Sequence, residues 1–390
     1  MQKAIEAYID SHREDIIEDW RALVNLEGRA DEPEAMDAVA AHLLEVFSAA
    51  GVNCRLERPH PEAPQVLVGE IGTGRPGKPV LFGGHYDTVF KKGTFGPSPF
   101  RIDEEGKAHG PGCLDMKGGI IIALYVIKAL EAAGYNERPL RVILCGDEEG
   151  GVHHAATGPL FHQMAEGCAC ALNMETGPIN NSLCVGRKGA MMGTFIVHGV
   201  SAHSGNNFEA GRNAIVEAAH KMLALDAMTD LEKGTAMNVA IVNGGKLWSQ
   251  IPDYCKVDFS CRFAKASEME HVMKEIETLM ATTRIDGTTT EYHPGGSGGV
   301  FEQNDTNMAL WAFCNQVSQE LGLGEMGHVF LGGGSDAVQM SSVGTPTLCS
   351  CGVLGEWNHT DREYAVVESM FTRAKLWCGV VQKLNAFQCP

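Results

Sequence analysis

Acids and histidines stand at the ends of several apolar segments of this sequence. In GGHYD, His85 and Asp87 end an apolar run and lie two residues apart, which places them on the same face of a strand. An aspartate on that face can accept the second ring N–H of a metal-binding histidine and fix its tautomer. The pair predicts a metal ligand with its supporting carboxylate, although a surface histidine beside an aspartate is the commoner case.

Further candidates follow along the chain. Asp115 in GPGCLDMKGG stands just before an apolar helix, where an N-cap aspartate is the simplest alternative. DEEGG places three consecutive acids, residues 147–149, at the end of the apolar segment VILCG. Adjacent like charges at the end of a buried strand are costly unless a cation offsets them, so this segment favours a metal site. The remaining candidates are Glu175 in NMETG and His359 in NHTD.

Together these residues supply two histidines and three to four carboxylates, without a thiolate. Mixed nitrogen and oxygen ligands suit a pair of divalent ions, zinc first, with cobalt or manganese as alternatives. Two ions about 3.5–4 Å apart need a bridging carboxylate and activate a shared water. The pattern therefore predicts a hydrolytic site.

Two other motifs compete with this interpretation. GTGRPG, residues 72–77, fits a dinucleotide-binding pattern, but a strand follows it instead of a helix, so we interpret it as a hairpin turn. GGSGG, residues 295–299, fits a nucleophile elbow, and Asp336 and His359 follow in the order of serine hydrolases. No apolar strand runs into this glycine-rich segment, so the serine-hydrolase hypothesis is disfavoured. Resistance to chelators would revive it.

The elements that must position these residues alternate between helices and apolar strands. Residues 3–50 have the periodicity of two amphipathic helices. Segments 66–71, 78–87 and 140–150 are predicted strands, and 118–133 is a predicted helix. Nearly all-apolar strands that alternate with helices indicate an α/β domain with a mostly parallel sheet between helices.

A different pattern begins near residue 188. Its order, βαββαβ, is the ferredoxin-like unit, which is large enough to fold alone. We therefore predict a catalytic domain of residues 1–187 and 297–390, interrupted by an inserted domain of residues 188–296, with PGGSGG as the return linker. The expected strands of the insertion are 192–200, 237–245, 254–263 and 288–294, and its expected helices are 211–225 and 267–280.

Composition excludes several classes of protein. The 390 residues carry 31 basic and 49 acidic side chains, a net charge of −18, without a basic tract, so nucleic-acid binding is not expected. No apolar run approaches the roughly 20 residues that span a bilayer, and the first residues carry acids where a signal peptide is apolar. We expect a cytoplasmic protein without a membrane partner, whose 13 cysteines are structural.

In chain order, GGHYDTV, GPGCLDMKGG, GDEEGG, SAHSG, GGGSDA and NHTD resemble the M20 metallopeptidase family. The stretch HYDTVFKKGTFGPSPFRIDEEGKAHGPG resembles its glutamate carboxypeptidase (carboxypeptidase G2-like) branch in particular. The motifs span residues 83–361, nearly the whole chain. The resemblance implies a zinc-peptidase-like catalytic domain with an inserted lid and dimerisation domain, and hence a homodimer.

The resemblance also implies a ligand set for two zinc ions. His85, Asp115 and Glu175 would hold one ion. Asp115, Glu149 and His359 would hold the other, so that Asp115 bridges the two. Apart from His85, His359 and His203 of the SAHSG motif, the remaining twelve histidines of the chain match no ligand position and are expected to be ordinary surface or core residues.

Further roles follow from the same resemblance. Glu148 would be the general acid/base, and Asp87 the supporting partner of His85. The Asp115–Met116 peptide bond would be cis. His203 of SAHSG would reach the active site of the partner subunit and contact the tetrahedral intermediate there.

Glutamate at position 175 is typical of carboxypeptidases and deacylases within the family, whereas aspartate is typical of aminopeptidases. The residues that the resemblance assigns to the substrate are Arg262 in FSCRF, Asn238 in MNVAIV, and Gly333 and Gly334 in GGGSDA. For Arg262 the alternative is a solvated strand end. Arg187 and Lys188 could also face an anionic substrate, or could simply be linker charges.

The sequence thus predicts a di-zinc hydrolase that cleaves an amide or peptide bond next to a free carboxylate. The first hypothesis is a carboxypeptidase that releases C-terminal glutamate or a similar amino acid from a small peptide. The alternative enzyme is an aminoacylase or N-acyl amino acid deacylase. A third hypothesis is a metal-binding scaffold without catalysis, which the presence of Glu148 disfavours.

Overall fold

The computed structural model describes residues 1–151 and 153–390, which form two compact units. Unit 1 consists of Met1–Gly186, Gln303–Phe330 and Ser335–Pro390. Unit 2 consists of Arg187–Glu302 and Leu331–Gly334. The glycine loop of GGGSDA therefore belongs to the inserted unit, whereas the aspartate that follows it belongs to unit 1.

Unit 1 is built on a six-stranded sheet with the order β1-β2-β6-β3-β7-β17. The strands are β1 (Asn53–Glu57), β2 (Val66–Ile71), β3 (Val80–His85), β6 (Leu140–Cys145), β7 (Cys170–Asn173) and β17 (Thr347–Leu348). Strands β6, β3, β7 and β17 pair in parallel, and β2 pairs antiparallel with both of its neighbours. The carboxyl ends of β3, β6 and β7 consequently lie together at one edge of the sheet.

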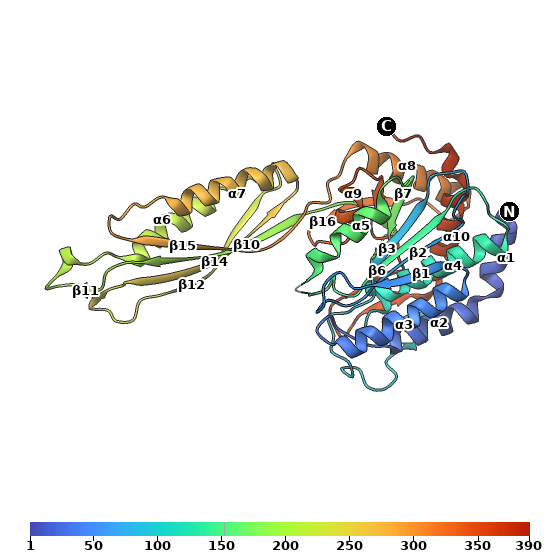
Figure 1. Ribbon diagram of the computed structural model, residues 1–390, viewed down its shortest axis with the longest axis horizontal. Helices are drawn as coiled ribbons and strands as arrows, with labels where there is room; N and C mark the ends of the chain where they lie inside the picture. Colours follow the sequence, from blue (N-terminus) through green and yellow to red (C-terminus); the bar gives the residue numbers. More distant parts are fainter. Residues whose placement is uncertain (152) are drawn as a thin grey trace. The chain divides into compact units, whose positions relative to one another are not determined.

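Helices cover both faces of this sheet (Figure 1). They are α1 (Gln2–Ser11), α2 (Arg13–Asn25), α3 (Pro33–Ala49), α4 (Gly118–Ala132), α5 (Gly158–Ala165), α8 (Asp305–Glu320), α9 (Ala337–Ser341) and α10 (Val367–Lys383). Alternate side chains of β3 enter different cores. Phe82 joins the large core with α4 and α10, whereas Leu81 joins the smaller core with Phe161 of α5 and Met340 of α9. Burial of both strand faces explains why the sequence of β3 is apolar throughout.

Shorter strands complete unit 1. One sheet contains β4 (Arg101–Ile102), β5 (Lys107–His109), β19 (Tyr364–Val366), β18 (Leu354–Glu356) and β8 (Gly177–Pro178), and another pairs β16 (Gly327–Leu331) with β9 (Ser182–Arg187). Within the described residues, no helix is both long enough and apolar enough to cross a membrane.

Unit 2 has a four-stranded antiparallel sheet with the order β12-β14-β10-β15. Helices α6 and α7 lie on the same face of this sheet (Figure 1). The elements are β10 (Gly189–His198), α6 (Ala214–Asp226), β12 (Ala236–Gly244), β14 (Tyr254–Phe263), α7 (Ala266–Ala281) and β15 (Thr289–Gly298), with a small pair β11 (Ala202–His203) and β13 (Gln250–Ile251). This is the βαββαβ order, and the predicted fold class is confirmed.

Three local predictions are wrong. PGGSGG is not a linker, because β15 continues to Gly298 and Gly298 pairs with Ala190 of β10. GTGRPG is not a hairpin turn, because β6 separates the two strands that it connects. The first amphipathic helix is divided at His12, whose ring stacks on Tyr8 and whose Nδ1 lies 2.7 Å from the Tyr8 carbonyl oxygen.

Candidate metal centre

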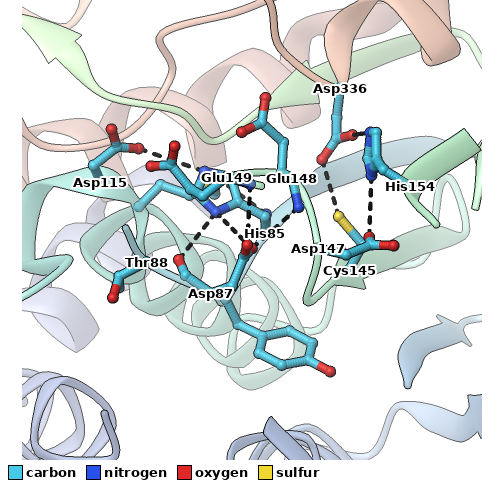
Figure 2. Close-up of polar contacts among 12 residues, drawn as sticks. His85, Asp87, Thr88, Asp115, Cys145, Asp147, Glu148, Glu149, His154 and Asp336 are labelled. Atoms are coloured by element: carbon cyan, nitrogen blue, oxygen red, sulfur yellow. Dashed lines mark hydrogen bonds and ion pairs between the residues drawn. The ribbon is translucent and has the colours of Figure 1, made fainter. Parts of the chain in front are cut away.

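His85 is the last residue of β3, and its buried ring is surrounded by carboxylates (Figure 2). Its Nδ1 lies 3.2 Å from Asp87 Oδ1. Its Nε2 lies 3.3 Å from Glu175 Oε1 and 3.4 Å from Asp115 Oδ1. The ring thus turns one nitrogen toward Asp87 and the other toward two further acids.

Asp115 lies between this group and a second one. Its Oδ2 is 3.2 Å from His359 Nε2, and that nitrogen is also 2.9 Å from Glu149 Oε1. The amide of Asn358 donates to the same Asp115 oxygen at 2.9 Å. One oxygen of Asp115 therefore faces His85 and the other faces His359, which is the arrangement of a bridging carboxylate.

Two glycines explain how the segments approach so closely. A Cβ at Gly119, in the first turn of α4, would lie 1.8 Å from the backbone oxygen of Met174, the residue before Glu175. A Cβ at Gly84 would lie 2.1 Å from the methyl carbon of Met116. Only glycine fits at position 119, where the clash is with backbone, whereas a side chain at position 84 would have to displace the end of the Met116 side chain. The GG of the β3 motif and that of LDMKGG thus bring the end of β3, the Asp115 segment and the end of β7 together.

Buried carboxylates hold the backbone of the segments that carry the acids. Asp87 accepts hydrogen bonds from the backbone N–H groups of Glu148, at 3.3 Å, and Glu149, at 3.0 Å. Glu363 accepts from the backbone N–H groups of Leu114, at 2.8 Å, and Asp115, at 3.1 Å. The fixed backbone directs the acids toward a common point. The Asp115–Met116 peptide bond is cis, as the resemblance implies.

Glu363 lies outside the motifs that predict the site. Its only signal is its position four residues after His359, in the same segment as a proposed ligand. Asn358 was missed for the same reason, since an amide beside a histidine has no distinctive pattern. Both act through hydrogen bonds to a residue more than 240 positions earlier in the chain.

The excess of acids changes the proton affinity of the centre. Burial lowers the pKa of His85, but its contacts with Asp115, Asp87 and Glu175 raise that pKa well above the ordinary value. The contacts with Asp115 and Glu149 raise the pKa of His359 to about 10. Burial is also the largest cause that raises the pKa of Glu148. A centre that retains protons so strongly is one that favours a cation.

The donor set fits divalent metal ions. His85 Nε2 and Asp115 Oδ1 are buried atoms that lack a hydrogen-bond partner, and such atoms are costly unless a ligand satisfies them. Three overlapping groups of possible ligand atoms occur within 4.8 Å: His85 with Asp115 and Glu175, Asp115 with Glu149 and His359, and His85 with Glu148 and Glu149. Nitrogen and carboxylate donors with one shared aspartate suit a two-metal centre.

The acid and histidine of the serine-hydrolase hypothesis do not pair. Asp336 contacts His154 at 3.1 Å, whereas His359 contacts Asp115 and Glu149. A triad needs its acid on the ring of its base. The serine of GGSGG, Ser297, belongs to β15 of the inserted unit.

The other predicted site residues lie in unit 2. His203 is exposed on β11. Arg262 on β14 and Asn238 on β12 are both exposed. Asn238 pairs with Ser260, and Ala236 pairs with Arg262 two residues further along β14, so both side chains lie on the same face of the sheet. Arg187 is buried, and its Nη1 donates to the carbonyl of Gly334 at 2.9 Å and, more weakly, to that of Gly333 at 3.4 Å. Arg187 is therefore part of the structure around the glycine loop and not a solvated linker charge.

Comparisons with known proteins agree with this geometry. Residues 81–383 match the model of Peptidase family M20/M25/M40. The chain is 28% identical to carboxypeptidase G2 of Pseudomonas sp. (strain RS-16), over 82% of this chain and 77% of that protein. It is 24% identical to succinyl-diaminopimelate desuccinylase of Cupriavidus taiwanensis, over 80% of this chain and 84% of that protein.

Solved structures share the fold. The aminopeptidase PepT of Bacillus cereus superposes with a TM-score of 0.80 at 18% identity, over 96% of this chain and 99% of that chain. An M20 family metallo-carboxypeptidase of Sulfolobus solfataricus superposes with a TM-score of 0.70 at 14% identity, over 95% and 99% of the two chains. The matched family model covers most of the chain and includes every residue described above around His85 and Asp115. This protein therefore belongs to the M20/M25/M40 peptidase family and is a hydrolytic enzyme.

Proposed function

We propose that this protein is a di-zinc hydrolase that cleaves an amide bond next to a free carboxylate and releases C-terminal glutamate or a similar amino acid. The main support is Asp115, whose two oxygens face two separate groups of ligand atoms. The relative named carboxypeptidase G2 supports the carboxypeptidase assignment. The desuccinylase relatives support the alternative, an N-acyl amino acid deacylase.

Under this proposal the ligands divide into two sets. His85, Asp115 and Glu175 hold one ion, and Asp115, Glu149 and His359 hold the other. Two zinc ions, or cobalt or manganese in their place, would supply Lewis acidity to the scissile carbonyl and to the attacking water. Asp87 orients the ring of His85 through Nδ1, at 3.2 Å.

Glu148 is the proposed general acid/base. Its backbone is fixed by Asp87, and its carboxylate adjoins the centre (Figure 2). Burial raises its pKa, which brings proton acceptance closer to neutral pH. Glu148 accepts the proton of the attacking water and then donates it to the leaving amine. Because this base is present, a non-catalytic scaffold is disfavoured.

His203 is suited to donate a hydrogen bond to the substrate. Its Nδ1 accepts from the backbone N–H groups of Gly205 and Asn206, both at 3.1 Å. Because Nδ1 accepts two hydrogen bonds, the proton of the neutral ring is on Nε2, and this nitrogen can donate an N–H to a ligand. We propose that this N–H stabilises the negative charge on the carbonyl oxygen in the active site of the partner subunit.

The inserted unit has the surface features of a dimerisation domain. Strand β12 is an edge strand of nine residues, and Ile241 and Val242 on it are about half exposed. On the next loop, Leu247 is 67% exposed and Trp248 is fully exposed. An unpaired edge strand with exposed apolar side chains favours pairing with another chain, and a two-fold symmetric dimer would cover the β12 edge of both subunits. We therefore propose a homodimer through unit 2.

Mixed dimers test the role of His203. We expect that inactive Glu148→Gln chains and inactive His203→Ala chains regain activity when mixed, because one site of each mixed dimer has both residues intact. Hydrolysis should be measured after subunit exchange has been verified with differently tagged chains. Absence of recovery despite exchange would place His203 in its own site or outside catalysis.

The proposed anchor for the substrate carboxylate is Arg262, with Asn238 beside it. Arg262 is exposed, whereas the Nη1 group of Arg187 already donates to Gly333 and Gly334. A guanidinium can bind a carboxylate through two parallel hydrogen bonds and so orient the adjacent amide. Gly333 and Gly334 remain proposed parts of the substrate pocket.

Metal removal should abolish hydrolysis. We expect about two divalent ions per chain in the replete enzyme, loss of activity after treatment with a chelator, and recovery when zinc, cobalt or manganese is added. Elemental analysis and activity assays check both points. One ion or none in the fully active enzyme would contradict the two-metal centre.

Hydrolysis of a substrate panel tests the function as a whole. The panel contains N-acyl amino acids and dipeptides that end in glutamate or leucine, each with a free or an amidated carboxylate. We expect substrates with the free carboxylate to be cleaved at least about 10²-fold faster than their amides. Faster cleavage of N-acyl amino acids than of dipeptides would favour the deacylase, and no cleavage at all would favour the scaffold.

We propose that this protein is located in the cytoplasm. The buried thiols of Cys113 and Cys145 fit that reducing compartment.

A further inference from the structure

A second cluster of ionisable side chains lies beside the metal centre, in unit 1 (Figure 2). The ring of His154 lies between two buried aspartates. Its Nδ1 is 3.0 Å from Asp147 Oδ1, and its Nε2 is 3.1 Å from Asp336 Oδ1. Each aspartate is 1% exposed. Cys145, the last residue of β6, donates its thiol proton to the other oxygen of Asp336 at 3.2 Å.

The geometry favours a charged ring. A neutral imidazole has one N–H, but here each ring nitrogen faces a carboxylate oxygen: Nδ1 makes a hydrogen bond with Asp147, and Nε2 is in ion-pair contact with Asp336. Burial lowers the pKa of His154, but the contacts with Asp147 and Asp336 raise it to about 11. One positive ring thus compensates two buried negative charges, which would otherwise be costly in this position.

The cluster is joined directly to the catalytic segment. Asp147 immediately precedes Glu148 and Glu149. Its backbone oxygen accepts from Gly151 N at 3.0 Å, and its carboxylate also accepts from Thr157 Oγ1 at 3.3 Å. Movement of the Asp147 side chain would therefore move the backbone on which both glutamates stand.

The other end of the bridge is fixed in the core. Asp336 immediately precedes α9, and Met340 of that helix is fully buried against Leu81 and Ile143 of the central sheet. The segment with the two glutamates is thus held from two sides. Asp87 binds its backbone N–H groups, and His154 ties the preceding aspartate to a helix that is packed on the sheet.

We propose that His154 is a positioning residue, whose protonated ring links Asp147 to Asp336 and thereby fixes the segment that presents Glu148 and Glu149. The catalytic consequence rests on the proposed hydrolytic function, whereas the structural consequence does not. Cys145, His154 and Asp336 could also be regarded as a metal-binding group. The thiol donates its proton to Asp336, and burial raises the pKa of Cys145 well above its ordinary value, so a thiolate ligand is disfavoured.

His154→Gln tests the bridge, with His162→Gln as the matched control. His162 is a half-buried histidine of the neighbouring helix α5, and it contacts the neutral side chain of Gln339 at 3.0 Å. In the metal-free protein, His154→Gln should accelerate hydrogen exchange in peptides that cover residues 146–157, and His162→Gln should not. In the metal-loaded enzyme, kcat should fall about 10- to 100-fold with little change in KM, the cost of a misplaced catalytic group.

Charge compensation distinguishes the bridge from simple packing. Adding Asp336→Asn to His154→Gln removes one of the two uncompensated negative charges, so the double variant should exchange more slowly and turn over faster than His154→Gln alone. If His154→Gln does not fold, Asp336→Asn alone provides the test, because it breaks one arm of the bridge and should also accelerate exchange in residues 146–157.

Wild-type exchange and kcat in folded His154→Gln would overturn the proposal, and so would a double variant that is no better than the single one. A third metal ion that is present in the wild type and lost in His154→Gln would overturn it in favour of a metal site. If the wild-type enzyme cleaves no member of the substrate panel, the proposed function fails, while the exchange experiment still tests the bridge.

Discussion

Glu148→Gln should lower kcat by at least about 10²-fold, which is the usual contribution of a positioned general base. Glutamine preserves the size and the backbone of the residue, and therefore the hydrogen bond from its backbone N–H to Asp87. It removes only the capacity to accept the proton of the attacking water. Steady-state kinetics with the best substrate of the panel would measure the effect.

Metal analysis of neighbouring variants makes this prediction specific. Glu148→Gln should retain both ions, whereas Glu149→Gln should bind metal less well, because Glu149 shares His359 Nε2 with Asp115. Glu166→Gln, an exposed residue elsewhere in unit 1, is the control for a change of charge alone. Near-normal turnover of Glu148→Gln, or loss of both ions from it, would mean that the two adjacent acids have been assigned in the wrong order.

Arg262→Ala should cost about 3–5 kcal/mol in kcat/KM, which is roughly 10²- to 10⁴-fold and is on the scale of a buried ion pair that loses one partner. Without substrate the Arg262 side chain is exposed to solvent. This magnitude therefore applies to the complex, in which the bound substrate covers the ion pair between Arg262 and its carboxylate. Amidation of the substrate carboxylate removes the other partner of the same interaction and should have a similar cost.

A double-mutant cycle with the two changes separates this anchor from other effects. Arg262→Ala combined with the amidated substrate should cost little more than either change alone, because both delete one interaction. Lys256→Ala is the matched control, since Lys256 lies on β14 on the same face of the sheet and pairs with Asp258. Equal rates for acids and amides would remove the carboxylate anchor and leave a two-metal amidase.

Several features of the protein could be predicted from the sequence alone. Apolar strands that alternate with helices indicated the mostly parallel sheet, because strands buried on both faces must be apolar throughout. The βαββαβ order indicated the inserted unit, because six consecutive elements form a local pattern. His85, Asp115, the acids 147–149, Glu175 and His359 could be named as candidate ligands because acids and histidines at the ends of apolar segments are too costly to serve only as packing. The choice of Glu149 as the ligand and the division between two ions came from the resemblance to the M20 family and remain predictions.

The glycine-rich segment shows where local pattern reasoning failed. PGGSGG has the composition of a linker, yet it extends β15 because β10 pairs with its backbone at Pro294, Ser297 and Gly298, on both sides of an irregularity in the register. Backbone pairing does not depend on side-chain type, so composition could not reveal it. The same applies to GTGRPG, since nothing in that turn specifies that β6 is inserted between β2 and β3.

The residues that hold the ligands in place were decided only by tertiary structure. His154 belongs to no recognisable motif, yet its ring lies between Asp147 and Asp336, which are 189 positions apart in sequence. Glu363 supports Asp115 from a distance of 248 positions. Ligand residues reveal themselves through their own chemistry at strand ends, whereas a supporting residue is defined by the partner that folding brings to it, and that partner is not recorded in the neighbouring sequence.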